Sequence, residues 1–354
     1  MAVHHSAIRE SGFVTIAEIT DDELAIRIDE AIASTEFSGV VRVDRGGELV
    51  FERAGGFADR RWSVPMTTTT RLSVASATKG FTALAVMALV EAGELTLDTR
   101  ARTLLGSDLP MIDDQVTIEH LLGMRSGIGD YLDEVAQSDI SNHVMRLPVH
   151  EFDSAEAYLA VLDGFPQVSP PGAEFAYNNG AFVVLGVLAE RAARRSYHVL
   201  VDELVVQRAG LVDTGFLRSD SLPAGVATGY LDREGLRTNA LHLPLIGCGD
   251  GGMFSTTADM ATFWTALFDA RIVSDEHVEL MTRPHSDASD HRRRYGLGFW
   301  LAPSGPTVFL EGYDAGVSFR SMHDPTTRIT RTTIANTSEG AWDLLRLVKE
   351  LREP

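Results

Sequence analysis

The segment Leu72-Ser73-Val74-Ala75-Ser76-Ala77-Thr78-Lys79 continues directly into a long apolar run that ends at a glycine. That run is apolar on nearly every side, which predicts a buried helix over residues 77–92. The alternating character of residues 70–75 predicts a short extended segment that leads into the helix. Ser76 is thereby placed at the helix N-terminus, and Lys79 lies one turn further along the same face.

Lys79 is one of only two lysines in the chain, which contains 29 arginines. Arginine stays charged at physiological pH, whereas a lysine amine in a dry pocket can lose its proton and act as a base. A buried helix usually excludes lysine unless the side chain is paired or functional. Because a serine beside such an amine can become a nucleophile, the Ser76 and Lys79 pair is a candidate catalytic feature. The spacing alone carries a real risk of coincidence.

The composition limits the possible partners. With 354 residues and 44% hydrophobic content, the chain can bury a large core. A net charge of -19 argues against nucleic-acid and anionic-membrane partners. The first residues lack the features of a secretory signal, and no segment approaches 18 unbroken apolar residues. We therefore expect a cytoplasmic protein with a small-molecule partner, and the oligomeric state stays open.

The histidines and the single cysteine, Cys248, show no spacing typical of metal ligands. We expect neither a catalytic metal nor a cofactor.

The order of the predicted elements indicates an α+β fold. Helices are predicted over residues 21–34, 181–193, 257–268 and 340–352, and another begins near 116; strands are predicted over 38–44, 48–54, 295–302, 307–310, 317–323 and 329–335. Short consecutive strands without crossover helices imply antiparallel pairing. We expect a single domain over 1–354. In it, helices flank an antiparallel sheet built from both chain ends, about 20–100 and 271–352, and an all-helical lobe is inserted over about 101–270.

A second candidate feature follows the turn Pro170-Pro171-Gly172. Tyr177 and Asn179 are alternate residues of a short loop, so both side chains could face one cleft. A phenol can relay a proton and an amide can orient a base, as an acyl-transfer site requires. Taken by themselves, both are ordinary loop residues.

Four ordered blocks resemble the serine β-lactamase-related superfamily, above all class C β-lactamases and their penicillin-binding-protein-like esterase and D-aminopeptidase relatives. The blocks are Ser76-Ala77-Thr78-Lys79, the segment 116–127, Pro171-Gly172 with Tyr177-Asn178-Asn179, and the segment 251–260. The resemblance spans roughly residues 37–337. It implies the β-lactamase/transpeptidase-like fold and a serine hydrolase.

The resemblance also implies roles for individual residues. Ser76 would attack an acyl carbonyl and form an acyl-enzyme, and Lys79 would take the serine proton. Tyr177 would shuttle protons, while Asn179 would hold Lys79 or the substrate amide. The backbone N–H groups of Ser76 and Tyr313 would form the oxyanion hole.

The chain departs from this family in the third motif. Relatives place a Lys-Thr-Gly or His-x-Gly triplet on an inner strand, whereas the matching residues here are Leu310, Glu311 and Gly312. Gly312 fits, but the cation that binds a substrate carboxylate is missing. Loss of such a charge-assisted contact costs about 1.5–3 kcal/mol, so carboxylate-bearing β-lactams should be disfavoured. Arg320 or Arg125 could substitute for the missing cation.

The expected substrate-binding residues are Asn179, Leu310, Glu311, Gly312 and Tyr313. With Phe309, Leu310 and Tyr313 at the cleft edge, small acyl esters are the favoured substrates. A free ammonium could instead be bound by Glu311 or Asp314, although a solvated turn between two strands is the favoured interpretation of these residues.

Two classes of function remain. One is a serine hydrolase of small esters, with β-lactamase or D-amino-acid peptidase or amidase activity as alternatives. The other is a catalytically silent binding or regulatory homologue. The segment Arg292-Arg293-Arg294 is expected to be an exposed loop.

Overall fold

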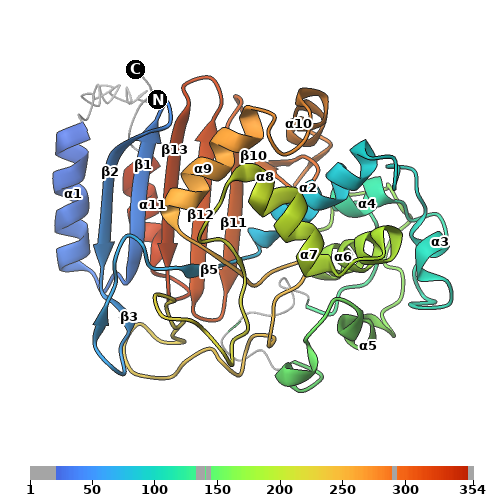
Figure 1. Ribbon diagram of the computed structural model, residues 1–354, viewed down its shortest axis with the longest axis horizontal. Coiled ribbons are helices and arrows are strands. Elements are labelled where there is room, and N and C mark those ends of the chain that lie inside the picture. Colours follow the sequence, from blue (N-terminus) through green and yellow to red (C-terminus); the bar gives the residue numbers. More distant parts are fainter. Residues whose placement is uncertain (1–20, 133–139, 141–144, 289–292, 350–354) are drawn as a thin grey trace, which may run out of the picture.

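The computed structural model describes residues 21–132, 140, 145–288 and 293–349. Its centre is an eight-stranded sheet with the strand order β2-β1-β13-β12-β11-β10-β9-β8 (Figure 1). The strands are β1 (Gly39–Arg45), β2 (Glu48–Gly55), β8 (Ser286–Asp287), β9 (Arg294–Tyr295), β10 (Trp300–Leu301), β11 (Val308–Asp314), β12 (Val317–Asp324) and β13 (Ile329–Ala335). All neighbours pair antiparallel, and β1 joins β13 with Gly39 opposite Ala335. The predicted α+β fold with a sheet from both chain ends is confirmed.

Helices cover both faces of this sheet (Figure 1). Helices α1 (Asp21–Ser34) and α11 (Ala341–Lys349) lie on one face, where Leu24, Ile28 and Leu344 pack with Val41 of β1. Helix α9 (Thr257–Phe268) lies on the other face, against β1 and β13. Because side chains alternate along a strand, β1 and β13 supply apolar groups to both layers. Residues of α9 fall in the range expected for the inserted lobe, yet they cover the sheet.

The remaining helices gather beyond β10 and β11, around α2 (Thr78–Glu91) and α6 (Asn179–Ala193) (Figure 1). They are α3 (Ala101–Leu105), α4 (Ile118–Leu122), α5 (Leu159–Leu162), α7 (Tyr197–Val201), α8 (Gln207–Ala209) and α10 (Asp275–Thr282), with the short 3-10 helices Val149–Glu151 and Glu156–Tyr158 and the π-helix Asp202–Val206. The described residues also form two small sheets. One consists of β3 (Phe57–Asp59) and β4 (Val64–Pro65), and the other of β5 (Leu72–Ala75), β7 (Met253–Ser255) and β6 (Gly215–Phe216). The described residues of the range 101–270 therefore include the two short strands β6 and β7, and the proposed division into two lobes stays a prediction.

The strand predicted over residues 295–302 is interrupted, which corrects the expectation. Gly298 has a φ of +86°, and a Cβ atom at this position would lie 2.2 Å from Ala83 Cβ. The chain therefore turns where its backbone approaches α2, and β9 and β10 form as two separate strands.

Among the described residues, no helix combines the length and the apolarity needed to cross a bilayer.

Candidate active site

Ser76 lies on a constrained turn between β5 and α2. Ala75 adopts a left-handed backbone with a φ of +46°, a conformation that costs about 1–2 kcal/mol for a residue with a side chain. The Thr78 hydroxyl donates to Ala75 O at 2.7 Å and accepts from Met253 N at 3.1 Å. These contacts tie the turn to β7 and leave Ser76 half-buried, with its side chain at the edge of a cleft.

The Lys79 amine lies directly behind the serine. Its side chain is buried, since the residue is only 2% exposed, and Nζ lies 3.0 Å from Ser76 Oγ. Nζ also donates to Asn179 Oδ1 at 2.8 Å and to Asp250 O at 2.7 Å. Two oxygens thus hold the amine from behind, and the third contact is made with the hydroxyl that would have to lose its proton.

Tyr177 and Asn179 approach Lys79 from the start of α6. The Tyr177 ring centroid lies 4.9 Å from Lys79 Nζ. The ring stacks on Trp300 of β10, with 5.9 Å between the ring centroids and an interplanar angle of 12°. Asn178 is the N-cap of α6, because its side chain accepts from Ala181 N at 2.7 Å. Asn179 is therefore the first helical residue, earlier than the start predicted near residue 181. The structure brings these residues and Ser76 together.

The third-motif residues divide between two sides of β11. Leu310 is 2% exposed and packs against Gly80 of α2, while a Cβ atom on Gly312 would lie 2.0 Å from Val74 O. Glu311 and Tyr313 instead line the cleft. Neither Phe309 nor Leu310 lines the cleft, which corrects the expectation that they form its edge. Leu310 lies on the opposite side of β11 from Glu311, because side chains alternate along a strand. Phe309 lies on the same side as Glu311 but is buried and stacks on Trp300, with 6.3 Å between the ring centroids.

Glu311 is paired with two arginines. Arg293 Nη1 lies 3.0 Å from Glu311 Oε1, and Arg320 contacts the other carboxylate oxygen. Arg293 also lies over the Trp300 ring, with its guanidinium carbon 4.3 Å from the centroid. Burial, followed by the neighbouring Arg293 charge, lowers the pKa of Arg320 to about 10. Arg293, which was expected in an exposed loop, therefore lines the cleft and supplies a cation there.

Two other suggested residues have structural roles. Arg125 donates to Gly172 O and fixes the turn before Tyr177, so it is engaged outside the third motif. Asp314 Oδ1 accepts from Ala315 N at 2.8 Å at the end of β11, as expected for a turn residue.

The cleft beside Ser76 has a volume of about 690 Å³. That size is within the usual range for small-molecule sites. Its walls are partly aromatic and partly polar, and they include Phe175, Tyr177, Trp300 and Tyr313 together with Asp130, Glu174, Arg293 and Glu311. Asp130 and Arg293 were missed by the sequence reasoning, since neither belongs to a short motif with a known spacing. Asp250, which supplies a main-chain oxygen, could not be recognised from residue type at all.

Within the described parts of the chain, no three His, Cys, Asp or Glu side chains are grouped so that they could hold a metal ion.

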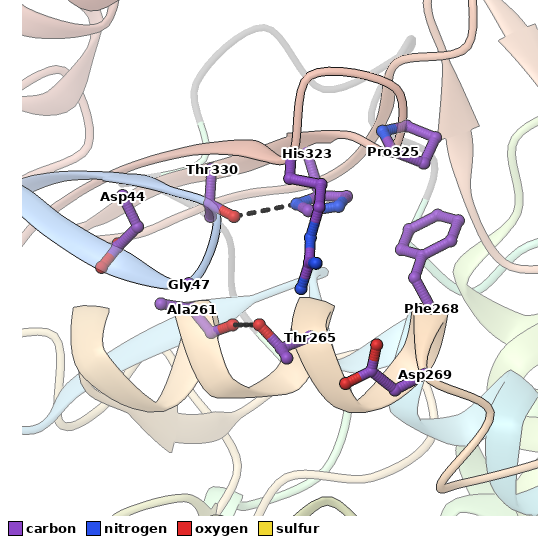
Figure 2. Close-up of a pocket in the computed structure, with 10 residues that line it drawn as sticks. Asp44, Gly47, Ala261, Thr265, Phe268, Asp269, His323, Pro325 and Thr330 are labelled. Carbon is purple, nitrogen blue, oxygen red and sulfur yellow. Dashed lines mark hydrogen bonds between the residues drawn. The ribbon is translucent and has the colours of Figure 1, made fainter.

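A second cavity of about 220 Å³ lies beside α9, near the connection between β12 and β13 (Figure 2). His323 lines this cavity, and its Nδ1 shares a 2.9 Å hydrogen bond with Thr330 Oγ1. The His323 ring stacks on Phe268, with 5.0 Å between the ring centroids. This cavity shares no lining residue with the cleft beside Ser76.

The chain is similar to several known proteins. The family model "Beta-lactamase" matches residues 25–351. Esterase EstB of Burkholderia gladioli is 37% identical over 213 residues, covering 58% of this chain and 53% of EstB. The D-aminopeptidase of Brucella anthropi is 29% identical over 277 residues, covering 75% of this chain and 49% of that enzyme.

The fold is also similar to solved structures. The crystal structure of a penicillin-binding protein from Bacillus halodurans matches with a TM-score of 0.86 and 33% identity, covering 92% of this chain and 99% of that chain. The matched part amounts to about half the length of EstB and of the D-aminopeptidase. The match of the family model over most of the sequence shows that the chain belongs to the β-lactamase family.

Proposed function

We propose that the protein is a serine hydrolase that forms an acyl-enzyme on Ser76 and acts on small neutral esters. The observation that carries this proposal is the 3.0 Å contact between the half-buried Ser76 hydroxyl and the buried Lys79 amine, at the edge of a cleft. The similarity to a protein named as an esterase supports it. A binding protein would not require this arrangement, because burying an amine is unfavourable. The catalytically silent alternative is therefore less well supported.

In the proposed reaction, Ser76 Oγ bonds to the acyl carbon while its proton moves to Lys79. The Tyr177 phenol passes a proton to the leaving alkoxide as the ester bond breaks, and water then releases the acyl group by the reverse proton path. The backbone N–H groups of Ser76 and Tyr313 would stabilise the oxyanion, each by about 3 kcal/mol. The position of Tyr313 supports this role, since β10 pairs with β11 at Val308 and Phe309 and β11 continues beyond the end of β10 along the cleft.

Neutral substrates are favoured because the charged groups of the third motif are already paired. Glu311 is held by Arg293 and Arg320, so a substrate ammonium would have to compete with two guanidinium groups. A substrate carboxylate would have to compete with Glu311 for Arg293. Each competition disrupts a charge-assisted contact of about 1.5–3 kcal/mol. An uncharged acyl group avoids both costs and can pack against the aromatic walls of the cleft.

Amide or lactam cleavage is the second candidate. The relative named as a D-aminopeptidase gives it support, and so does the presence of Arg293 in the cleft. A cation is available near the third motif even though Leu310 does not provide one. β-Lactamase and D-amino-acid peptidase or amidase activities must therefore be measured beside esterase activity.

The decisive measurement is hydrolysis of p-nitrophenyl acetate and butyrate by wild-type protein, Ser76→Ala and the control Ser73→Ala. We expect turnover and an acyl-enzyme mass shift with wild type and Ser73→Ala, and neither with Ser76→Ala. If the wild type shows neither signal, the hydrolase proposal is wrong. Nitrocefin and D-alanine p-nitroanilide are assayed in parallel, and a higher kcat/KM on either would overturn the ester preference.

A further inference from the structure

The segment Asp130-Tyr131-Leu132 contacts Asn179 and Asp250, the two residues whose oxygens accept hydrogen bonds from the Lys79 amine. Asp130 and Leu132 bond to Asn179, and Tyr131 bonds to Asp250. From the sequence, the surrounding stretch 129–165 is expected to shape one wall of the cleft, but none of these three residues has a role of its own, and none belongs to the four family-like blocks.

The segment fixes which end of the Asn179 amide meets the lysine. Asn179 Nδ2 donates to Leu132 O at 2.9 Å, and Asn179 Oδ1 lies 2.8 Å from Lys79 Nζ. If the amide were turned over, its NH₂ group would face the amine and its oxygen would face the Leu132 carbonyl. Both of those contacts would be repulsive, so the Leu132 carbonyl selects the orientation in which Asn179 accepts from Lys79.

Asp130 holds the main chain of Asn179 at the same time. Its carboxylate accepts from Asn179 N at 2.7 Å, from Gly180 N at 2.9 Å and from Leu132 N at 3.2 Å. The first two N–H groups belong to the first turn of α6, where a negative charge is favourable. Charge-assisted hydrogen bonds of this kind are shorter and stronger than neutral ones. Asp130 therefore ties the start of α6, and Asn179 with it, to the loop.

Tyr131 reaches the other acceptor of the amine. Its hydroxyl donates to Asp250 Oδ2 at 2.6 Å, and Asp250 O accepts from Lys79 Nζ at 2.7 Å. Burial raises the pKa of Tyr131 well above its ordinary value, so the phenol keeps the proton that it donates. The same three-residue segment thus fixes Asn179 on one side of Lys79 and Asp250 on another.

We propose that Asp130, Tyr131 and Leu132 form a positioning clamp that aims the Lys79 amine at the Ser76 hydroxyl by fixing Asn179 and Asp250. The clamp rests on the proposed function, in which Lys79 takes the serine proton. Asp130 and Tyr131 are positioning residues in this proposal, because they act on the reaction through other side chains. Two alternative roles lead to different outcomes: Asp130, which lines the cleft, could contact the substrate itself, or the segment could serve only to stabilise the fold.

The test compares acylation in wild type, Asp130→Asn, Tyr131→Phe and the matched control Tyr158→Phe. Tyr158 is buried and its hydroxyl donates to Ile246 O at 3.2 Å, so the control removes the same atom from a tyrosine that is not hydrogen-bonded to Asn179 or Asp250. The measurement is the burst of p-nitrophenolate from p-nitrophenyl butyrate, with KM and kcat determined separately. We expect the acylation rate to fall about tenfold in Asp130→Asn and in Tyr131→Phe, with KM within about twofold of wild type, and to stay unchanged in Tyr158→Phe.

Several results would overturn the clamp. Wild-type acylation rates in both clamp variants would contradict it. A rise in KM at constant kcat in Asp130→Asn would also contradict it, because that result would indicate direct contact between Asp130 and the substrate. An equal loss of rate in Tyr158→Phe would show that general stability is responsible. Crystal structures of the two clamp variants give a readout that does not depend on activity. We expect the distance from Lys79 Nζ to Asn179 Oδ1 in Asp130→Asn, or to Asp250 O in Tyr131→Phe, to exceed about 3.5 Å.

Failure of the proposed function and failure of the clamp remain distinguishable. A wild-type protein that never acylates refutes the hydrolase, and the two crystal structures then decide whether the segment positions Lys79. A wild-type protein that acylates, with clamp variants that acylate equally fast, refutes the clamp alone.

Discussion

Lys79 Nζ and Asn179 Oδ1 lie 2.8 Å apart, although 100 positions separate the two residues in the sequence. Lys79 belongs to α2 and Asn179 to α6, and these helices pack against each other in the core. The position of the amine is therefore set by the packing of two buried helices. Such a site is held more rigidly than one built on loops.

Replacing Lys79 by arginine tests the proposed proton transfer. A guanidinium keeps the positive charge but cannot act as a base at neutral pH. We expect Lys79→Arg to lower the acylation rate by about 10²–10⁴-fold, the usual contribution of general base catalysis. The p-nitrophenyl butyrate burst measures this rate, and a thermal melt verifies folding. A folded Lys79→Arg variant with wild-type acylation would remove Lys79 from the mechanism.

Gly312→Ala tests the close approach of β11 to β5. The added Cβ would lie 2.0 Å from Val74 O, so β11 must move away from the turn that carries Ser76. Overpacking of this kind typically costs about 1–3 kcal/mol, and we expect esterase activity to fall with it because Tyr313 moves too. The matched control is Gly215→Ala, where nothing lies within 4 Å of the added atom. Urea unfolding and ester hydrolysis are measured for both, and equal behaviour of the two variants would contradict the prediction.

The ionisation of Asp130 should affect stability and activity in opposite directions. Burial raises its pKa from 3.8 to about 6, with a smaller contribution from the Asp250 charge, against the opposing effect of its three N–H contacts. A carboxyl whose pKa is raised on folding contributes stability that is fully present at pH values below its unfolded pKa, near 3.8. That contribution is lost as the pH rises through the folded pKa of about 6. It amounts to at most about 3 kcal/mol, because one pKa unit corresponds to about 1.4 kcal/mol.

Asp130→Asn removes this titration. We expect urea unfolding between pH 4 and pH 7 to show a smaller fall in the free energy of unfolding for the variant than for wild type. In activity, we expect a loss of wild-type kcat as the pH drops below about 6, the pKa of Asp130, because the protonated carboxyl holds the α6 N–H groups less well. If kcat of Asp130→Asn falls at low pH in the same way as kcat of wild type, a group other than Asp130 causes the loss of activity.

His323 should make the fold sensitive to acid. Burial lowers the pKa of His323 from 6.5 to about 4, and its ring stacks against both Trp264 and Phe268. A lowered histidine pKa contributes stability that is complete above about 6.5 and is lost as the pH falls through about 4. His323→Phe keeps the stacking and removes the charge. We expect its free energy of unfolding to be lower by about 1 kcal/mol at pH 7, from the lost bond to Thr330, but to fall less between pH 6.5 and pH 4.

Urea unfolding across that pH range measures the effect, and the exposed His150→Gln serves as the control. If wild type and His323→Phe lose the same free energy between pH 6.5 and pH 4, His323 does not carry the acid sensitivity.

Local signals predicted the elements that have clear ends. The helix over 257–268 matches α9, where the Thr256 side chain accepts from Asp259 N as an N-cap. The strand over 329–335 matches β13. Between the predicted strands 38–44 and 48–54, Gly46 and Gly47 both have positive φ, as glycines of a tight turn often do. In these cases the residues that end an element are neighbours in the sequence, so sequence alone is informative.

The parts of the site that were mispredicted depend on tertiary packing. A short apolar strand does not reveal which side faces the cleft, so Leu310 was placed at the cleft edge although it packs against α2. Arg293 reaches Glu311 only because β9, β10 and β11 return alongside one another. Every residue has a main-chain oxygen, so only the fold shows that the one of Asp250 accepts from Lys79. Motifs pointed to the candidate reactive groups, whereas the residues that contact them are found only in the structure.

The pairing of β1 with β13 has a consequence for biosynthesis. A ribosome releases Ser76 and Lys79 long before β11, the strand that forms one wall of the cleft, and β13, the strand that completes the sheet beside β1. Until those last strands emerge, the nascent chain carries Ser76, the proposed nucleophile, without the oxyanion donor proposed on β11. A growing polypeptide should therefore be inert toward cellular esters, and reactivity should appear only at the end of translation.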